Sequence, residues 1–218
     1  MRILSIHVGG VREVEWKGRR VTTGIFKEPV DGPVAVGLTG LDGDRQADLE
    51  VHGGPSKAVY AYPASHYPAW RDELPGRDLP WGIFGENLTV EGLDENSVCV
   101  GDAFDVGTAR LVITQSRVPC FKLGIRFGDS EMVRRMLDSG RFGFYFGVER
   151  QGTMSAGDEL APVRRDPQRV SVADVARLYL NRSRDPGLMA RAIAIPALTP
   201  SWRAGFERKL RALEPAGA

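Results

Sequence analysis

The sequence predicts a mainly β fold over residues 1–165, followed by a small domain of three helices over residues 166–218. Glycine usage divides the chain at this point, because only three of the 26 glycines follow residue 165. The hydrophobic period also changes, from two residues before Pro167 to 3.6 residues after it. Together these observations indicate a β-barrel with inserted helices and a helical C-terminal domain.

The β domain is predicted from short β-prone runs that recur between turns rich in Gly, Asp, Asn and Pro. Such spacing is typical of an all-β barrel or sandwich. The predicted strands are residues 3–8, 22–26, 34–39, 58–62, 88–90, 98–106, 110–115 and 143–148. Two inserted helices are expected, one after Ser65 and one that opens at Asp129 or Ser130 and ends at Gly140.

Three helix starts are visible after Pro167. Ser171 is followed at the third position by Asp174, which is the pattern of a capping box. The pairs Asp185-Pro186 and Thr199-Pro200 each place a capping residue before a proline that opens a helix. Three short helices cannot form a large core of their own, so we expect them to pack on one another and on the barrel.

Charge and hydropathy exclude several classes of partner. The 29 basic and 28 acidic residues give a net charge of +1, which produces no overall field for a nucleic-acid polymer or an anionic membrane. No run of about 18 apolar residues occurs, and glycines interrupt the N-terminal segment before a signal-peptide core can form. We expect a cytoplasmic monomer or homodimer that acts on a small molecule.

Cys120 is the residue that points most directly to chemistry. It follows a strand-like run, with Arg117 three residues before it and Lys122 two residues after it. These cations favour the thiolate, the form that attacks electrophiles and binds soft metals. A lone cysteine is more often an inert core residue, which is what we expect of Cys99 between two valines. Two cysteines 21 positions apart and three scattered histidines form no disulfide framework and no zinc site.

Paired glycines precede one of the predicted strands. Gly53 and Gly54 let backbone N–H groups approach an anion or a ring edge, and His52 and Lys57 can add a donor and a charge. The same Gly-Gly-Pro sequence is also an ordinary turn. Both interpretations remain open on spacing alone.

A second polar cluster lies where a loop enters the strand at residues 88–90. Glu86 and Asn87 can form a hydrogen-bonding pair for the edge of a heterocycle, or they can cap the strand end and face solvent. Lys27 follows another predicted strand, from which it can reach a phosphate, although such a lysine is often simply exposed.

Taken in order, these motifs resemble the MOSC domain family, the module shared with molybdenum cofactor sulfurases, and most closely its YiiM-like branch. That branch has a short three-helix domain after the barrel, so the resemblance covers almost the whole chain. The matching segments are residues 27–30, 43–48, 51–54, 57–60, 84–89, 101–102 and 117–123.

The resemblance implies a molybdenum cofactor whose metal takes its protein thiolate from Cys120. It implies the reduction of N-hydroxylated compounds, such as hydroxylamines and N-hydroxylated purine bases. His52 is then the expected proton donor. The cofactor-binding residues expected from this resemblance are Lys27, Gly53, Gly54, Lys57, Tyr62, Glu86, Asn87, Arg117 and Lys122.

Three functions of different classes stay open at this point: a molybdenum-dependent oxidoreductase, a non-catalytic carrier or sensor of the cofactor, and a sulfur-transfer protein that depends on Cys120. The sequence contains no cysteine set for an iron–sulfur cluster and no Gly-rich flavin or NAD motif. An enzyme would therefore need a separate electron-donor reductase. The family is also associated with pyridoxal phosphate through its sulfurase relatives, but spacing marks no lysine for a Schiff base.

Overall fold

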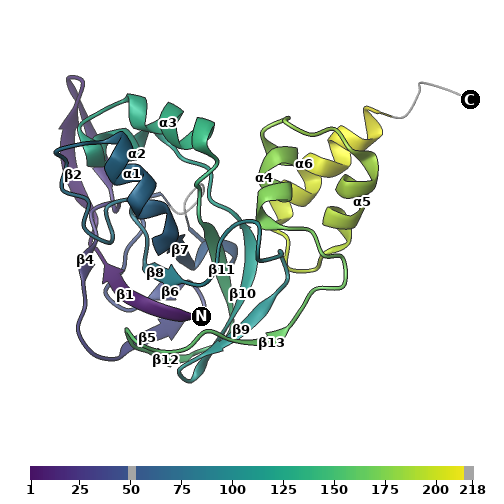
Figure 1. Ribbon diagram of the computed structural model, residues 1–218, viewed down its shortest axis with the longest axis horizontal. Coiled ribbons are helices and arrows are strands. Elements are labelled where there is room, and N and C mark those ends of the chain that lie inside the picture. The colour runs from purple at the N-terminus through teal and green to yellow at the C-terminus, as the bar shows by residue number, and fades with distance from the viewer. Residues whose placement is uncertain (49–52, 214–218) are drawn as a thin grey trace, which may run out of the picture.

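The computed structural model describes residues 1–48 and 53–213 (Figure 1). Its main body is a large curled sheet of eight strands of the described chain. They are joined in the order β13 (Ala161–Arg164), β9 (Ala103–Val106), β10 (Ala109–Ser116), β11 (Phe144–Arg150), β7 (Val59–Pro63), β8 (Leu88–Glu91), β1 (Arg2–Val8) and β4 (Glu28–Pro29). Neighbouring strands run antiparallel except for β7 and β8, which are parallel. The curled sheet with its inserted helices confirms the predicted barrel-like β domain.

The large sheet has short strands at its two edges, β13 and β4, and longer strands such as β10 and β11 between them. A smaller sheet joins β5 (Val34–Gly37), β6 (Gly40–Leu41) and β12 (Gly152–Met154), and a hairpin joins β2 (Arg12–Trp16) to β3 (Arg19–Thr23).

Several strand boundaries differ from the prediction. The run at 98–106 forms a strand only from Ala103, because residues 98–102 turn around the buried Asp102, whose carboxylate accepts a hydrogen bond from the Cys99 amide at 3.1 Å. The strand predicted at 22–26 lies instead at Arg19–Thr23, as β3. Its hairpin partner β2 was not predicted, because β2 is polar and largely exposed and shows no clear hydrophobic alternation.

Three helices, rather than the two predicted, are inserted in the β domain. They are α1 (Tyr67–Glu73), α2 (Phe121–Phe127) and α3 (Glu131–Ser139), and two single turns, η1 (Pro55–Lys57) and η2 (Ala64–His66), flank β7. These helices cover one side of the sheet over a second hydrophobic core. The largest side chains of this core are Tyr60, Tyr62, Tyr67, Trp70, Phe84, Phe127 and Phe142.

The C-terminal domain contains the three predicted helices, α4 (Val172–Tyr179), α5 (Pro186–Ala194) and α6 (Pro200–Arg211). Ser171 and Asp185 cap α4 and α5 by accepting hydrogen bonds from the amides of Asp174 and Leu188, both at 3.0 Å. Side chains of all three helices belong to the same buried hydrophobic cluster as the sheet. The helices are thus fixed against the β domain beside β10 (Figure 1). No helix in the described ranges is long and apolar enough to cross a membrane.

Candidate functional site

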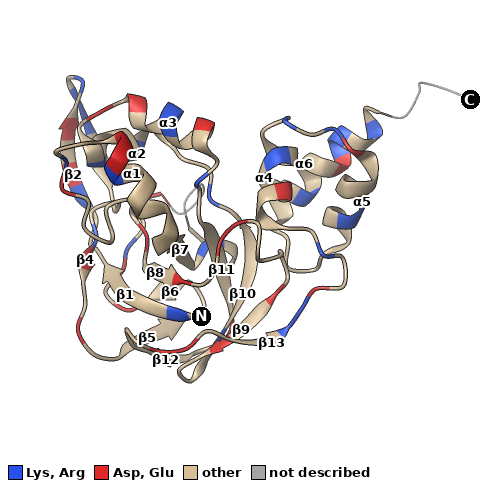
Figure 2. Ribbon diagram, viewed as in Figure 1, with Lys and Arg blue, Asp and Glu red and all other residues tan. Residues whose placement is uncertain are grey.

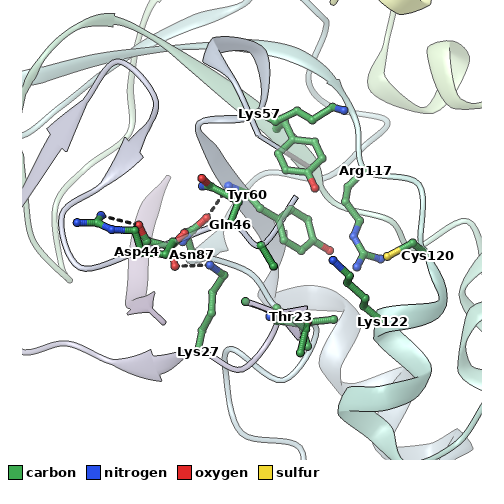
Figure 3. Close-up of a pocket in the computed structure, with 16 residues that line it drawn as sticks. Thr23, Lys27, Asp44, Gln46, Lys57, Tyr60, Asn87, Arg117, Cys120 and Lys122 are labelled. Carbon is green, nitrogen blue, oxygen red and sulfur yellow. Dashed lines mark hydrogen bonds and ion pairs between the residues drawn. The ribbon is translucent and has the colours of Figure 1, made fainter. Parts of the chain in front are cut away.

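A pocket opens on the face of the β domain where β7, β11 and the loop after β10 meet (Figure 3). Its cavity volume is about 90 Å³, and further space opens to solvent. Its walls are Thr23, Gly24, Ile25, Lys27, Asp44, Arg45, Gln46, Ala47, Lys57, Tyr60, Gly85, Asn87, Arg117, Cys120, Lys122 and Tyr145. Five of the predicted site residues other than Cys120 are thus brought together with it.

Cys120 lies at the end of the loop that leaves β10, immediately before α2. Its backbone is extended and its carbonyl accepts a hydrogen bond from the Leu123 amide at 3.0 Å, so it occupies the N-cap position of the helix. The loop is anchored because the amide of Arg117 donates to the Gly143 carbonyl at 3.1 Å. The thiol is partly exposed, in contrast to the buried Cys99. A fixed and accessible thiol is the arrangement that metal ligation requires.

Arg117 is buried beside Cys120, and Figure 3 shows its guanidinium turned toward the sulfur atom. The guanidinium carbon is 5.2 Å from the centre of the Tyr60 ring, and Nη1 is 3.3 Å from the sulfur of Met136. Burial lowers the pKa of Arg117, but Tyr60, Tyr145 and Cys120 raise it, and the net direction is upward. Arg117 therefore remains a cation next to the thiol.

Lys27 and Asp44 form a buried ion pair in the wall opposite Cys120 (Figure 3). Asp44 Oδ1 accepts hydrogen bonds from Lys27 Nζ and, at 2.9 Å, from the amide of Gly9. Burial lowers the pKa of Lys27, and the adjacent Asp44 opposes that shift. The second carboxylate oxygen, Asp44 Oδ2, is buried and accepts no hydrogen bond from any residue in the described ranges. A buried acceptor of this kind calls for a donor from a ligand or from an ordered water.

Two further cations, Lys57 and Lys122, complete the lining. Burial lowers the pKa of Lys57, while the nearby Asp48 raises it. With Lys27, Arg45 and Arg117, the pocket walls hold five basic side chains against the single carboxylate of Asp44. The local charge is therefore strongly positive although the whole chain is nearly neutral, and an anionic ligand is favoured.

Glu86, expected to bind a heterocycle, lies outside the pocket lining. Its carboxylate accepts hydrogen bonds from the Tyr67 hydroxyl, the amides of Gly82 and Phe84 at 2.8 and 3.1 Å, and the Thr89 hydroxyl at 3.1 Å. Burial raises the pKa of Glu86 despite these donors. Both oxygens are used within the protein, so the structure gives Glu86 an architectural position rather than access to a ligand.

Asn87 reaches the pocket wall, but its side chain also joins strands. Its oxygen accepts from the Tyr60 amide at 3.0 Å, and its nitrogen donates to the His7 carbonyl at 3.1 Å. Tyr62 faces the aromatic core, where its hydroxyl receives the Trp70 indole N–H at 2.6 Å. The tyrosine of β7 that lines the pocket is Tyr60.

The glycine motif contributes indirectly. Gly53 and Gly54 are absent from the pocket lining, and Gly54 precedes η1 with a positive φ of 88°, which favours glycine. The turn that follows ends in Lys57, so the motif places that lysine in the pocket wall. His52, the expected proton donor, lies outside the described residues.

Several lining residues were not predicted from their own sequence context. Tyr145 lies opposite Tyr60 in the pairing of β11 with β7, a relation that only the sheet topology reveals. Asp44, Arg45 and Gln46 contributed to the family resemblance, and that motif was the available signal for their presence in the site. In the described ranges, no group of three or more His, Cys, Asp or Glu side chains could hold a metal ion. A metal bound to Cys120 would therefore need most of its ligands from a cofactor.

Comparison with protein families gives two matches. Residues 48–161 match the model of the MOSC domain, and residues 170–212 match that of the YiiM-like, 3-alpha helix domain. The first match spans the pocket residues from Lys57 to Tyr145, and the second spans α4, α5 and α6.

Curated proteins with similar sequences come from bacteria and a fungus. Uncharacterized protein YflK of Bacillus subtilis is 40% identical over 98% of this chain and 96% of its own length. Protein YiiM of Escherichia coli is 34% identical over 85% and 83% of the two chains. A protein named Reductase from Gibberella moniliformis is 34% identical over 89% of this chain, but the match spans only 35% of that longer protein.

A solved structure has the same arrangement. The crystal structure of YiiM from Geobacillus stearothermophilus superimposes with a TM-score of 0.81 at 35% identity, covering 96% of this chain and 98% of that one. The curled sheet, its inserted helices and the C-terminal helical domain are thus shared with a solved YiiM.

Proposed function

Because this chain belongs to the MOSC domain family, in the branch with a YiiM-like three-helix domain, we propose that it is a molybdenum cofactor-dependent oxidoreductase. Its proposed substrates are N-hydroxylated compounds, such as hydroxylamines and N-hydroxylated purine bases. A separate electron-donor reductase supplies the electrons. The observation that carries this proposal is the accessible thiol of Cys120 in a pocket lined by buried cations and by Asp44 Oδ2, which accepts no hydrogen bond from the described residues.

The residues of the pocket fit the three chemical parts of such a cofactor. Cys120 offers a soft ligand for molybdenum. Lys27, Lys57 and Lys122 offer charge-assisted donors for a phosphate. Asp44 Oδ2 offers a buried acceptor for an N–H group of a pterin ring. This set supports the cofactor on the basis of the side chains themselves.

When bound, a molybdenum cofactor supplies two-electron redox chemistry at a metal centre. The residues of this chain would hold and orient it. Cys120 provides the protein bond to the metal, and Arg117 compensates the negative charge of the thiolate. The Tyr60 side chain forms a fixed part of the pocket wall, because its hydroxyl donates to the Phe142 carbonyl at 2.8 Å. Reduction of an N–OH group to N–H consumes two electrons and two protons and releases water. His52 is the proposed proton donor.

The enzyme interpretation is favoured over a carrier or a sulfur-transfer protein by one comparison. A relative that matches 89% of this chain is named Reductase. That name belongs to the fungal protein, and it supports an oxidoreductase as the first function to test here.

Freshly purified protein tests the proposal in two steps. We expect molybdenum by metal analysis and oxidised pterin by fluorescence, in near-equal molar amounts with the protein. Reduced methyl viologen should then support reduction of N-hydroxyadenine to adenine. Molybdenum and pterin without reduction of any N-hydroxylated compound would support the carrier, whereas protein that binds neither when expressed with an intact cofactor pathway would support sulfur transfer.

A further inference from the structure

A second hollow adjoins the candidate site and is formed mainly by the C-terminal helices. It has a volume of about 660 Å³, and Lys57 lines both this hollow and the pocket that contains Cys120. Figure 3 shows the Lys57 side chain extending from the rim of the pocket, away from Lys27. The two cavities therefore meet at one lysine.

One side of α6 forms a wall of the hollow. Ser201, Gly205, Arg208 and Ala212 line it and recur every three or four residues, so they share one helix face over about 16 Å. Gly205 leaves space along this face, and Arg208 Nη2 lies 4.0 Å from the position that a Cβ at residue 205 would occupy. The guanidinium thus lies along the helix in the hollow.

An aromatic surface forms another wall. Tyr179 is 42% exposed and is stacked on Trp202, with ring centres 4.2 Å apart and planes within 15°. Lys209 holds the end of α4 beside this stacked pair, because its ammonium donates to the carbonyls of Leu178 and Tyr179 at 2.7 and 3.0 Å. The hollow therefore presents a supported aromatic ring rather than a loose side chain.

The charge of the hollow is entirely positive. Lys57, Arg208 and Lys209 line it together with neutral residues, and none of the described lining residues is acidic. The Arg208 side chain makes no hydrogen bond or ion pair with another residue in the described part of the chain. Residues 166–218 contain nine Lys and Arg but five Asp and Glu, and the basic positions on α4, α5 and α6 are visible in Figure 2. An anion is the ligand that these groups favour.

We propose that this hollow is the phosphate and sugar subsite for an N-hydroxylated purine nucleotide whose base enters the Cys120 pocket. The inference rests on the proposed function and names its substrate class. Arg208 binds the phosphate through its planar group of N–H donors, and the exposed face of Tyr179 packs on the ribose. Lys57 lies where the nucleotide passes from one cavity to the other. A free base has no phosphate or ribose that could occupy this cationic hollow.

Turnover with reduced methyl viologen tests the subsite directly. We expect kcat/KM to be higher for N-hydroxyadenosine 5′-monophosphate than for N-hydroxyadenine. Arg208→Gln should lower kcat/KM for the monophosphate by about ten- to a hundredfold, as expected for a lost charge-assisted hydrogen bond, and leave the value for the base unchanged. Arg191→Gln, an exposed change on α5 outside the hollow, is the matched control.

Binding provides a readout that does not need the loaded enzyme. Calorimetry on cofactor-free protein should detect adenosine 5′-monophosphate, and Arg208→Gln should weaken it by a similar factor while Arg191→Gln does not. Reduction of the base without a preference for the monophosphate, together with no effect of Arg208→Gln, would overturn the subsite and leave the proposed function intact.

Two other outcomes separate the remaining explanations. Loss of reduction for every N-hydroxylated compound would overturn the proposed function, whereas nucleotide binding that depends on Arg208 would still support the hollow as an anion site. If Arg208→Gln slows turnover with a flavodoxin as electron donor but not with methyl viologen, the hollow docks the donor protein and the nucleotide assignment is overturned.

Discussion

Thr199, the residue before α6, donates a buried hydrogen bond of 2.5 Å to the side-chain oxygen of Gln115, near the end of β10. Gln115 in turn donates to the Ser116 carbonyl at 3.2 Å, next to Arg117. The threonine that the sequence marks as a helix cap makes no capping hydrogen bond with its side chain. Its hydroxyl instead ties the C-terminal domain to the strand that leads to Cys120.

Thr199→Val should lower the free energy of unfolding by about 1–3 kcal/mol, because it leaves the buried Gln115 oxygen without a donor. Thr199→Ser keeps a hydroxyl and should recover most of the loss. Urea unfolding of the three proteins measures the difference. Equal losses in the valine and serine variants would show that the hydrogen bond contributes little.

Cys120→Ser should abolish molybdenum retention, since a hydroxyl is a poor ligand for this soft metal site. Cys99→Ser should retain the metal, because Cys99 is buried and outside the pocket lining. Burial also raises the pKa of Cys99, which disfavours its thiolate. Metal analysis of the two purified variants is the measurement, and equal loss in both would contradict the assignment of the ligand.

Replacing Arg117 should change the acidity of Cys120. Arg117→Met removes the cation while keeping a long side chain, so the pKa of the Cys120 thiol should rise and cofactor content should fall. Arg117→Lys should lie closer to wild type. The rate of thiol alkylation against pH in cofactor-free protein reports this pKa, with Arg191→Met as the surface control. An unchanged dependence of the alkylation rate on pH for Arg117→Met would show that the guanidinium has no electrostatic effect on the thiol.

His7 should make stability depend on pH between 6.5 and 4. Burial, and then the charge of Lys27, lower its pKa to about 4 from 6.5. The unfolded chain therefore binds a proton that the folded chain does not as the pH falls through this interval, and stability is lost on acidification. The loss attributable to His7 is at most about 3 kcal/mol.

His7→Asn should remove this contribution while leaving the other titrating groups in place. Its unfolding free energy should fall less between pH 7 and pH 4.5 than that of the wild type, measured in urea at each pH. Parallel losses in the two proteins would show that His7 is protonated at its ordinary pKa in the folded state. Gly82 packs against His7 and should stay unchanged in these experiments, because a Cβ at position 82 would lie 2.8 Å from a carbon of the His7 ring.

Glu86→Gln should destabilise the fold by about 2–4 kcal/mol, because an amide nitrogen would face donors that the carboxylate now satisfies. Cofactor content per folded molecule should stay near wild type, since Glu86 lies outside the pocket lining. Thermal unfolding together with metal analysis separates the two effects. A variant that is as stable as wild type but has lost the cofactor would show that Glu86 belongs to the binding site.

Local signals explain which elements could be predicted. The helices α4 and α5 have side-chain caps that the sequence displays directly. By contrast, α2 has only seven residues, includes Gly124, and begins directly after Pro119-Cys120. A short segment with these residues has a weak helical pattern, so tertiary packing decides its structure.

The candidate site was predictable to the extent that its residues are neighbours in sequence. Arg117, Cys120 and Lys122 lie on one short segment, and the structure places all three in one pocket. The pairing of Tyr60 with Tyr145 depends on sheet topology. The position of Glu86 outside the pocket lining could not be predicted for a similar reason, because the Tyr67 hydroxyl that donates to its carboxylate lies 19 residues away on α1.

The first strand also sets an order for biosynthesis. β1 pairs with β8 on one side, and the amide of Ile3 donates to the carbonyl of Asp158 at 3.0 Å on the other. Its last hydrogen bonds therefore form only after about three quarters of the chain has been synthesised. Contacts so distant in sequence slow folding because a large loop must close first. A nascent chain therefore carries Lys27 and Asp44 for most of its synthesis before the pocket can form, and the proposed cofactor would be loaded late in synthesis or after it.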